Sequence, residues 1–284
     1  MRIDLHAHST ISDGTSTPAE LVAEAAAAGL DVVALTDHDS TAGWTPARES
    51  LPPGLTLLPG LELSCRWYGP GRPIGLHLLG YLVDPRHPGL ATELRRILRA
   101  RATRAERMVG LLRADGIDVT WEEVRGYAAG GVVGRPHLAQ ALVARGLVDS
   151  VSAAFASEWL GERYRVPKQD VEVFRGLRLI RDAGGVPVFA HPKAHRRGPI
   201  VPDELIGELA DAGLFGIEGD HIDHGPTERE HVRRLAAELG LVVTGSSDYH
   251  GRNKMVRLGE HTTAPEAYHR IVAAGHGAAP MVAA

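Results

Sequence analysis

The chain has 284 residues, of which 44% are hydrophobic and 23% charged, and it contains one cysteine. Such values are typical of a globular protein, and a chain of this length buries a core without disulfides. A net charge of −4 at pH 7 argues against a broad basic surface for duplex DNA. We expect a cytoplasmic protein, because the chain has a single cysteine and no apolar leader. It also has no long apolar run, so we expect no contact with a membrane, and no obligate protein partner is evident.

A strand and a capped helix open the chain. Thr17 and Glu20 form a predicted capping box, Pro18 takes the first helical position, and Gly29 ends the helix. Residues 31–36 are almost continuously apolar, as in a buried parallel strand. The alternation of apolar runs and helical stretches then predicts an α/β core, either barrel-like or doubly wound. Residues 55–63 and 76–82 are likewise expected to form parallel strands, and further strands are expected at 186–190, 216–218 and 241–245. Helices are expected near 173–184, 202–213 and 226–240.

Residues 91–168 interrupt this pattern. They contain an Arg-rich helix at 94–115, for which a solvated face is expected, and no convincing strand. Shorter helical segments are expected near 121–128, 136–145 and 151–160. We therefore predict an inserted helical subdomain at 91–168 that covers the active site, and a core domain formed by 1–90 and 169–284.

Histidine is unusually frequent, at 15 residues of 284. His6 and His8 are two apart in the first strand, so their side chains point to the same face. Other histidines and carboxylates follow the expected strands, where α/β enzymes place their catalytic groups. These further candidate metal ligands are Asp13, His38, Glu62, His77, His191, Asp248 and His250.

Six imidazoles and three carboxylates are too many ligands for one ion. They predict two or three divalent ions, with Glu62 able to bridge, and the ligand types suit Mn, Fe or Zn. Three divalent ions would exceed the three carboxylates by three positive charges, and this excess favours an anionic substrate such as a phosphate. We therefore expect phosphoester hydrolysis, with a metal-bridging hydroxide as the nucleophile.

Five short motifs resemble one known family. His-x-His near the start, Thr-Asp-His-Asp, Gly-x-Glu, Ala-His-Pro and Ser-Asp-x-His, in this order, are similar to those of the PHP (polymerase and histidinol phosphatase) family of metal-dependent phosphoesterases. The resemblance implies a distorted seven-stranded, TIM-like β/α barrel with a trinuclear centre, and it implies Asp4 and Asp37 as partners that orient the ligands. The ions it implies lie near His6, His8, Glu62 and Asp248; near Glu62, His77 and His191; and near Asp13, His38 and His250.

The inserted segment narrows the expected substrate. Gly134-Arg135-Pro136-His137 opens a helix, where a guanidinium and a helix N-terminus suit a phosphate. With Val166-Pro167-Lys168, it resembles the PHP subgroup that removes the 3′-phosphate of nucleoside 3′,5′-bisphosphates, some members of which are 5′-to-3′ exoribonucleases on short RNA. The resemblance implies a small nucleotide or short RNA substrate whose phosphate is bound by Arg135, His137, Lys168 and Arg197.

A histidine that does not bind metal is expected to protonate the leaving group, and His221 and His224 are the candidates. Arg135 is the third residue expected to take part in catalysis. Two alternatives use the same kind of centre: an L-histidinol phosphate phosphatase, and an amidohydrolase acting on C–N bonds. A third alternative is a non-catalytic PHP module that binds a nucleotide or a partner protein.

Overall fold

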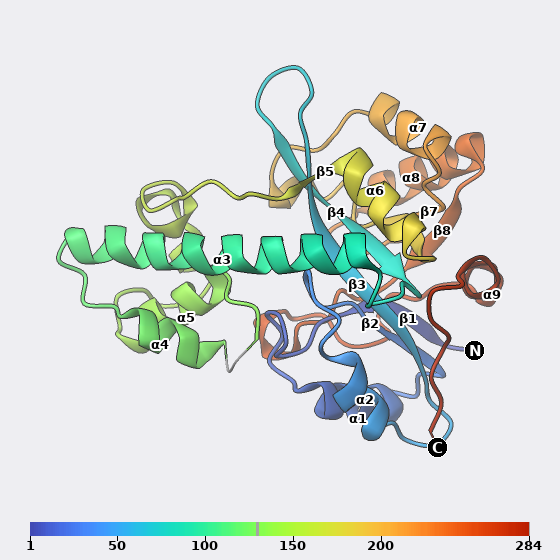
Figure 1. Ribbon diagram of the computed structural model, residues 1–284, viewed down its shortest axis with the longest axis horizontal. Helices are drawn as coiled ribbons and strands as arrows, with labels where there is room; N and C mark the ends of the chain where they lie inside the picture. The colour runs from blue at the N-terminus through green and yellow to red at the C-terminus, as the bar shows by residue number, and fades with distance from the viewer. Residues whose placement is uncertain (129–130, 284) are drawn as a thin grey trace.

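The computed structural model describes residues 1–128 and 131–283 (Figure 1). Its sheet has the strand order β1-β2-β3-β4-β6-β7-β8, and β5 pairs with β3 off this path. The strands are β1 (Ile3–Ala7), β2 (Val32–Leu35), β3 (Thr56–Trp67), β4 (Ile74–Tyr81), β5 (Val171–Glu172), β6 (Val186–Phe189), β7 (Gly216–Asp220) and β8 (Val242–Gly245). Beyond β8, Tyr249 bridges back to Ala7 at the end of β1. The sheet is thus a nearly closed barrel, and the predicted distorted TIM-like fold is confirmed.

The direction of β4 differs from the prediction of a parallel strand. β4 runs antiparallel to both of its neighbours, β3 and β6, whereas the other neighbouring strands of the path pair in parallel. The connection from Trp67 to Ile74 is too short for a crossover helix, and it contains Gly69-Pro70-Gly71, so it turns the chain back as a hairpin. As a result, the first residues of β4 lie at the barrel end where the parallel strands finish.

Helices cover the outside of the barrel. They are α1 (Pro18–Ala27), α2 (Trp44–Glu49), α6 (Val173–Asp182), α7 (Asp203–Asp211), α8 (Pro226–Leu239) and α9 (Pro265–Ala274). The predicted capping box of α1 is present, since Glu20 N donates to Thr17 Oγ1 and Thr17 N donates to Glu20 Oε2. Ile3, Leu58 and Tyr81 belong to a fully buried apolar cluster contributed by the strands. This packed interior fixes the strand ends that carry the polar residues.

The helical insert stands beside the barrel. Its long helix α3 (Pro88–Ala114) runs from the strands out to α4 (Trp121–Tyr127) and α5 (Arg135–Ala144) (Figure 1). The insert has its own core, in which Met108, Leu112, Leu138 and Leu142 are fully buried. No helix in the described part of the chain is long and apolar enough to cross a membrane.

Residues 151–160 do not form the single regular helix that was predicted. This segment forms a short 3-10 turn, η1 (Ala153–Phe155), followed by a wide turn, η2 (Ser157–Gly161), with a kink at Trp159. Tertiary contacts decide its path, because Leu160 is fully buried in the core of the insert and its carbonyl accepts a hydrogen bond from Arg135.

Candidate metal centre

The nine candidate ligands gather at one end of the barrel. His6 lies near the end of β1, His191 follows β6, and Asp248 follows β8. Glu62 lies within β3, and the reversed direction of β4 brings His77 to the same end. The backbone has positive φ at His191 (34°) and Asp248 (52°), a conformation that costs about 1–3 kcal/mol in a non-glycine residue. Two of the candidate ligands are therefore held in strained positions.

A first group of ligand atoms surrounds a single point. The Nε2 atoms of His6 and His8 are 3.0 Å apart. Asp248 Oδ1 lies 3.4 and 3.3 Å from them, and Glu62 Oε2 lies 3.3 and 3.2 Å from them. Ligands bound to a transition metal at about 2.1 Å are separated from one another by roughly these distances. The two imidazole nitrogens and the Asp248 oxygen are thus spaced as ligands of one ion, and Glu62 Oε2 lies beside both nitrogens.

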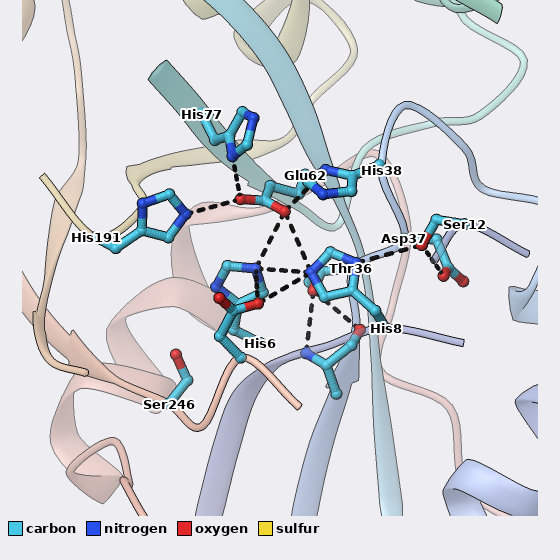
Figure 2. A network of polar contacts seen from close by, with 12 residues as sticks. His6, His8, Ser12, Thr36, Asp37, His38, Glu62, His77, His191 and Ser246 are labelled. Carbon is cyan, nitrogen blue, oxygen red and sulfur yellow. Dashed lines mark hydrogen bonds and ion pairs between the residues drawn. The ribbon is translucent and has the colours of Figure 1, made fainter. Parts of the chain in front are cut away.

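Glu62 links this group to a second one. Its Oε1 lies 2.7 Å from His77 Nδ1 and 3.0 Å from His191 Nε2. Its Oε2 faces the first group and lies 2.9 Å from His38 Nδ1. Figure 2 shows the imidazoles arranged around this carboxylate. The two oxygens of Glu62 therefore serve different sets of histidines, as a bridging ligand does.

A third group lies on the other side of His8. Asp13 Oδ1 is 3.2 Å from His250 Nε2, and Asp13 Oδ2 is 3.7 Å from His38 Nε2. A tight turn places Asp13 here, since Gly14 N donates to Ser9 O at 3.0 Å. A Cβ on Gly14 would lie 2.2 Å from the carbonyl oxygen of His8, so only glycine fits this turn.

Buried hydrogen bonds fix the orientation of His6 and His8. His6 Nδ1 lies 3.1 Å from Glu218 Oε1, a carboxylate that can only accept, so His6 Nε2 is left free to bind a metal. Ser12 Oγ donates to Asp37 Oδ1 at 2.6 Å and therefore accepts from His8 Nδ1 at 3.3 Å (Figure 2). Asp37 thus acts on His8 through Ser12, and the free nitrogens of both rings face the same point.

The donor set of the centre fits divalent ions. His38 Nδ1, His77 Nδ1 and Asp13 Oδ1 are buried and lie close to charged or imidazole atoms, but they make no well-directed hydrogen bond within the described structure. Burial alone would raise the pKa of Glu62, but the neighbouring His38 and His77 hold it well below its usual range. Carboxylates that remain charged and imidazoles with unsatisfied nitrogens are costly to bury without a cation. Three groups of these side chains could each hold an ion: His6, His8 and Asp248; His38, Glu62 and His77; and His8, Asp13, His38 and His250.

Cationic side chains line a cavity next to the histidines. Arg135, Lys168 and Arg197 share this cavity of about 410 Å³ with His77 and His191. Arg197 also donates to Asp248 Oδ2 and to Asp223 Oδ2, each at 2.6 Å. The structure therefore brings three of the four predicted phosphate ligands to one side of the centre.

His137, the fourth predicted phosphate ligand, is buried at the start of α5 and does not line this cavity. Its Nδ1 accepts a hydrogen bond of 3.0 Å from Gly134 N. This contact caps the helix and leaves the proton of the ring on Nε2, so the phosphate contact of His137 stays a prediction. The position of Arg135 depends on this helix start.

His221 and His224 differ in their freedom to transfer a proton. Both ring nitrogens of His224 are bonded to backbone, since Nε2 accepts from Lys193 N at 3.1 Å and Nδ1 donates to Gly219 O at 3.0 Å. Of the two candidates for the proton donor, His224 therefore has no free ring nitrogen. His221 Nδ1 accepts from Asp223 N, so its proton is on Nε2, which lies 3.3 Å from Asp248 Oδ2. Only His221 of this pair keeps an N–H at the centre.

Sequence reasoning missed two contacts of the centre, and the contact of Asp4 with His6 is made through the backbone. Glu218 Oε2 accepts from His191 N at 2.8 Å, so this carboxylate holds two candidate ligands. Lys254 Nζ lies 2.6 Å from Asp248 Oδ2. Asp4 does not contact the ring of His6. It accepts from the backbone N of His6 at 3.4 Å, of Ser247 at 3.0 Å and of Gly259 at 2.8 Å, and it thereby holds β1 and the loop after β8 together.

Comparisons with known proteins agree with this architecture. The PHP domain model matches residues 4–77. The chain is 30% identical over 266 residues to the 5′-3′ exoribonuclease Rnm of Escherichia coli (strain K12), covering 92% of this chain and 89% of that protein. It is 33% identical over 263 residues to the 3′,5′-nucleoside bisphosphate phosphatase of Chromobacterium violaceum, covering 92% and 91%.

A solved structure extends the agreement to the whole fold. A protein of Bifidobacterium adolescentis, assigned as a metal-dependent phosphoesterase, superposes with a TM-score of 0.89 and 34% identity over 96% of each chain. Both the barrel and the helical insert thus have counterparts in related proteins. Together with the full-length relatives, this likeness shows that the chain belongs to the PHP domain family of metal-dependent phosphoesterases.

Proposed function

We propose that the protein removes the 3′-phosphate of nucleoside 3′,5′-bisphosphates and also degrades short 5′-phosphorylated RNA from its 5′ end. The observation that carries this proposal is the arrangement of three ligand groups around Glu62, directly beside a cavity lined by Arg135, Lys168 and Arg197. The exoribonuclease activity of the E. coli relative and the bisphosphate phosphatase activity of the C. violaceum relative support the same two substrates. The nine side chains would hold two or three Mn, Fe or Zn ions.

In the proposed reaction, each part of the site has a separate task. Divalent ions held by the nine ligands would lower the pKa of a bound water and offset the charge of the phosphoryl group. Arg135 and Lys168, both from the inserted segment 91–168, bind and orient the substrate phosphate. Arg197, fixed by Asp223 and Asp248, offsets the charge that develops on the phosphoryl oxygens. His221 donates its Nε2 proton to the leaving oxygen.

Phosphate release by the purified protein with Mn²⁺ tests this function. We expect turnover of adenosine 3′,5′-bisphosphate and of a short 5′-phosphorylated RNA, with little release from L-histidinol phosphate. Strong turnover of histidinol phosphate with an inert bisphosphate would overturn the proposed substrate. Tight nucleotide binding without turnover of any substrate would instead favour a non-catalytic module.

The KM of the bisphosphate is expected to rise as the pH increases through about 8. Burial, together with Arg101, Arg104 and Arg135, lowers the pKa of Lys168 to about 8. The ammonium group binds phosphate below this pH, and its charge is lost above it. A pH profile of KM measures the effect. The variant K168R keeps its charge and is expected to remove this rise, so an equal rise in K168R would contradict the role of Lys168.

A further inference from the structure

A basic groove leads from the metal centre to the outer face of α3. The cavity beside His77 and His191 shares Arg66, Arg72, Arg135, Arg165 and Lys168 with a second cavity of about 440 Å³. The second cavity shares Arg104, Val166 and Pro167 with a third one, of about 410 Å³, that lies along α3. The third cavity is also lined by Arg95, Arg96, Arg99 and Arg107. We call this continuous series of cavities the α3 groove.

Arg104 is a buried cation in the middle of the α3 groove. Its side chain is 7% exposed, its Nε has no hydrogen-bond partner, and it makes no ion pair with any described residue. Burial, with the nearby cations Arg101 and Arg135, lowers the pKa of Arg104 to about 10. A buried guanidinium without an anion is costly, and this one lines both outer cavities. Arg104 is therefore placed to receive an anion from the groove.

The outer part of the groove offers further cations that are not neutralised. Arg99 and Arg107 are exposed and form no hydrogen bond or ion pair with any described residue. With Arg95 and Arg104, they line the same cavity along α3. The only acidic side chain among the described residues that line the three cavities is Glu162. A ligand of the groove would thus meet a row of positive charges.

We propose that the α3 groove binds the phosphodiester backbone of a single-stranded oligonucleotide whose terminal phosphate lies at the metal centre. This inference rests on the proposed function, since the groove opens from the cavity that would hold the reacting phosphate. A row of arginines that starts at a phosphoesterase centre matches the repeated charge of a nucleic acid strand. A mononucleotide would fill only the inner cavity. The groove therefore favours oligonucleotides by their downstream phosphates.

Binding to the metal-free protein tests this inference independently of turnover. Fluorescence anisotropy with EDTA measures the Kd of labelled 5′-phosphorylated RNAs of about two to eight nucleotides. The variant R99Q/R107Q removes two unpaired surface charges, and R113Q is the matched control because Arg113 is exposed on α3 but does not line the groove. We expect R99Q/R107Q to weaken binding of the longest RNA about 10-fold, to leave the dinucleotide and adenosine 3′,5′-bisphosphate unchanged, and to reduce the salt slope by about 1.4.

The outcomes separate this inference from the proposed function. If the protein hydrolyses the bisphosphate but binds long and short RNA equally tightly, the proposed role of the α3 groove is wrong and the proposed function stands. Equal losses in R113Q and R99Q/R107Q, or equally tight binding of poly-glutamate or duplex RNA, would also overturn it. R104K is a second variant, which keeps the charge of Arg104 but loses the planar guanidinium with its several donors. We expect it to weaken the binding of long RNA selectively and to unfold at the wild-type temperature.

Discussion

Replacing Glu62 with glutamine is expected to lower kcat/KM by about 10³-fold or more and to remove most of the bound metal. The two oxygens of Glu62 face different histidines, with Oε1 2.7 Å from His77 and Oε2 3.2 Å from His8. Glutamine has nearly the same shape, but it is neutral and its amide nitrogen cannot bind an ion. Both ligand groups that share this residue would lose a charged ligand at once. Steady-state kinetics and elemental analysis of the purified variant measure the two effects.

Glu93→Gln is the matched control for this experiment. Glu93 is also a buried glutamate, 3% exposed, but it lies in α3 and pairs with Arg96 and Arg175 at 2.6 and 2.8 Å. E93Q should lose some stability and keep its metal content and kcat. If E62Q retained wild-type metal content and lost activity only as much as E93Q, Glu62 would not be the shared ligand of the centre.

The ligands could be found from the sequence because each one sits in a short local pattern. His6 and His8 share a face by the alternation of a strand, and the others follow apolar runs that read as buried strands. A barrel brings the ends of such strands together whatever its exact register, so the convergence of the ligands did not require the order of the strands. His77 also lies with the other ligands, although its strand runs in the opposite direction to the one predicted. Its position at the start of a reversed strand is equivalent to the end of a parallel one.

The contacts that orient the ligands could not be found in this way. Glu218 lies inside β7, and its partners His6 and His191 come from distant parts of the chain. The available signal was a glutamate within an expected buried strand, which is costly unless it is paired. The backbone contacts of His137 and His224 could not be found either. Backbone groups use one ring nitrogen of His137 and both ring nitrogens of His224, and only the folded structure shows those donors and acceptors.

Adding Mn²⁺ to the metal-free protein is expected to raise its unfolding temperature by about 10 °C at a free concentration near 1,000 times the Kd. The increase should become larger between about pH 7 and pH 9. Burial alone lowers the pKa of His8, but hydrogen bonds to Asp248 and Glu62 raise it to about 9. The metal-free site therefore holds a proton on His8 at neutral pH. An imidazole binds metal only when neutral, so ion binding must release this proton.

The sign of the pH dependence follows from the raised pKa. The pKa of His8 in the unfolded chain is about 6.5, so its proton stabilises the metal-free fold fully below that pH. This stabilisation is lost as the pH rises through about 9, where ions bind without competition from the proton. Calorimetry with and without Mn²⁺ measures the gap in unfolding temperature, and titration in buffers of different ionisation enthalpy counts the released protons. H269Q, which alters an exposed histidine, should behave as wild type, whereas H8Q should lose both effects. A constant gap with no proton release would show that His8 does not exchange its proton for a metal ion.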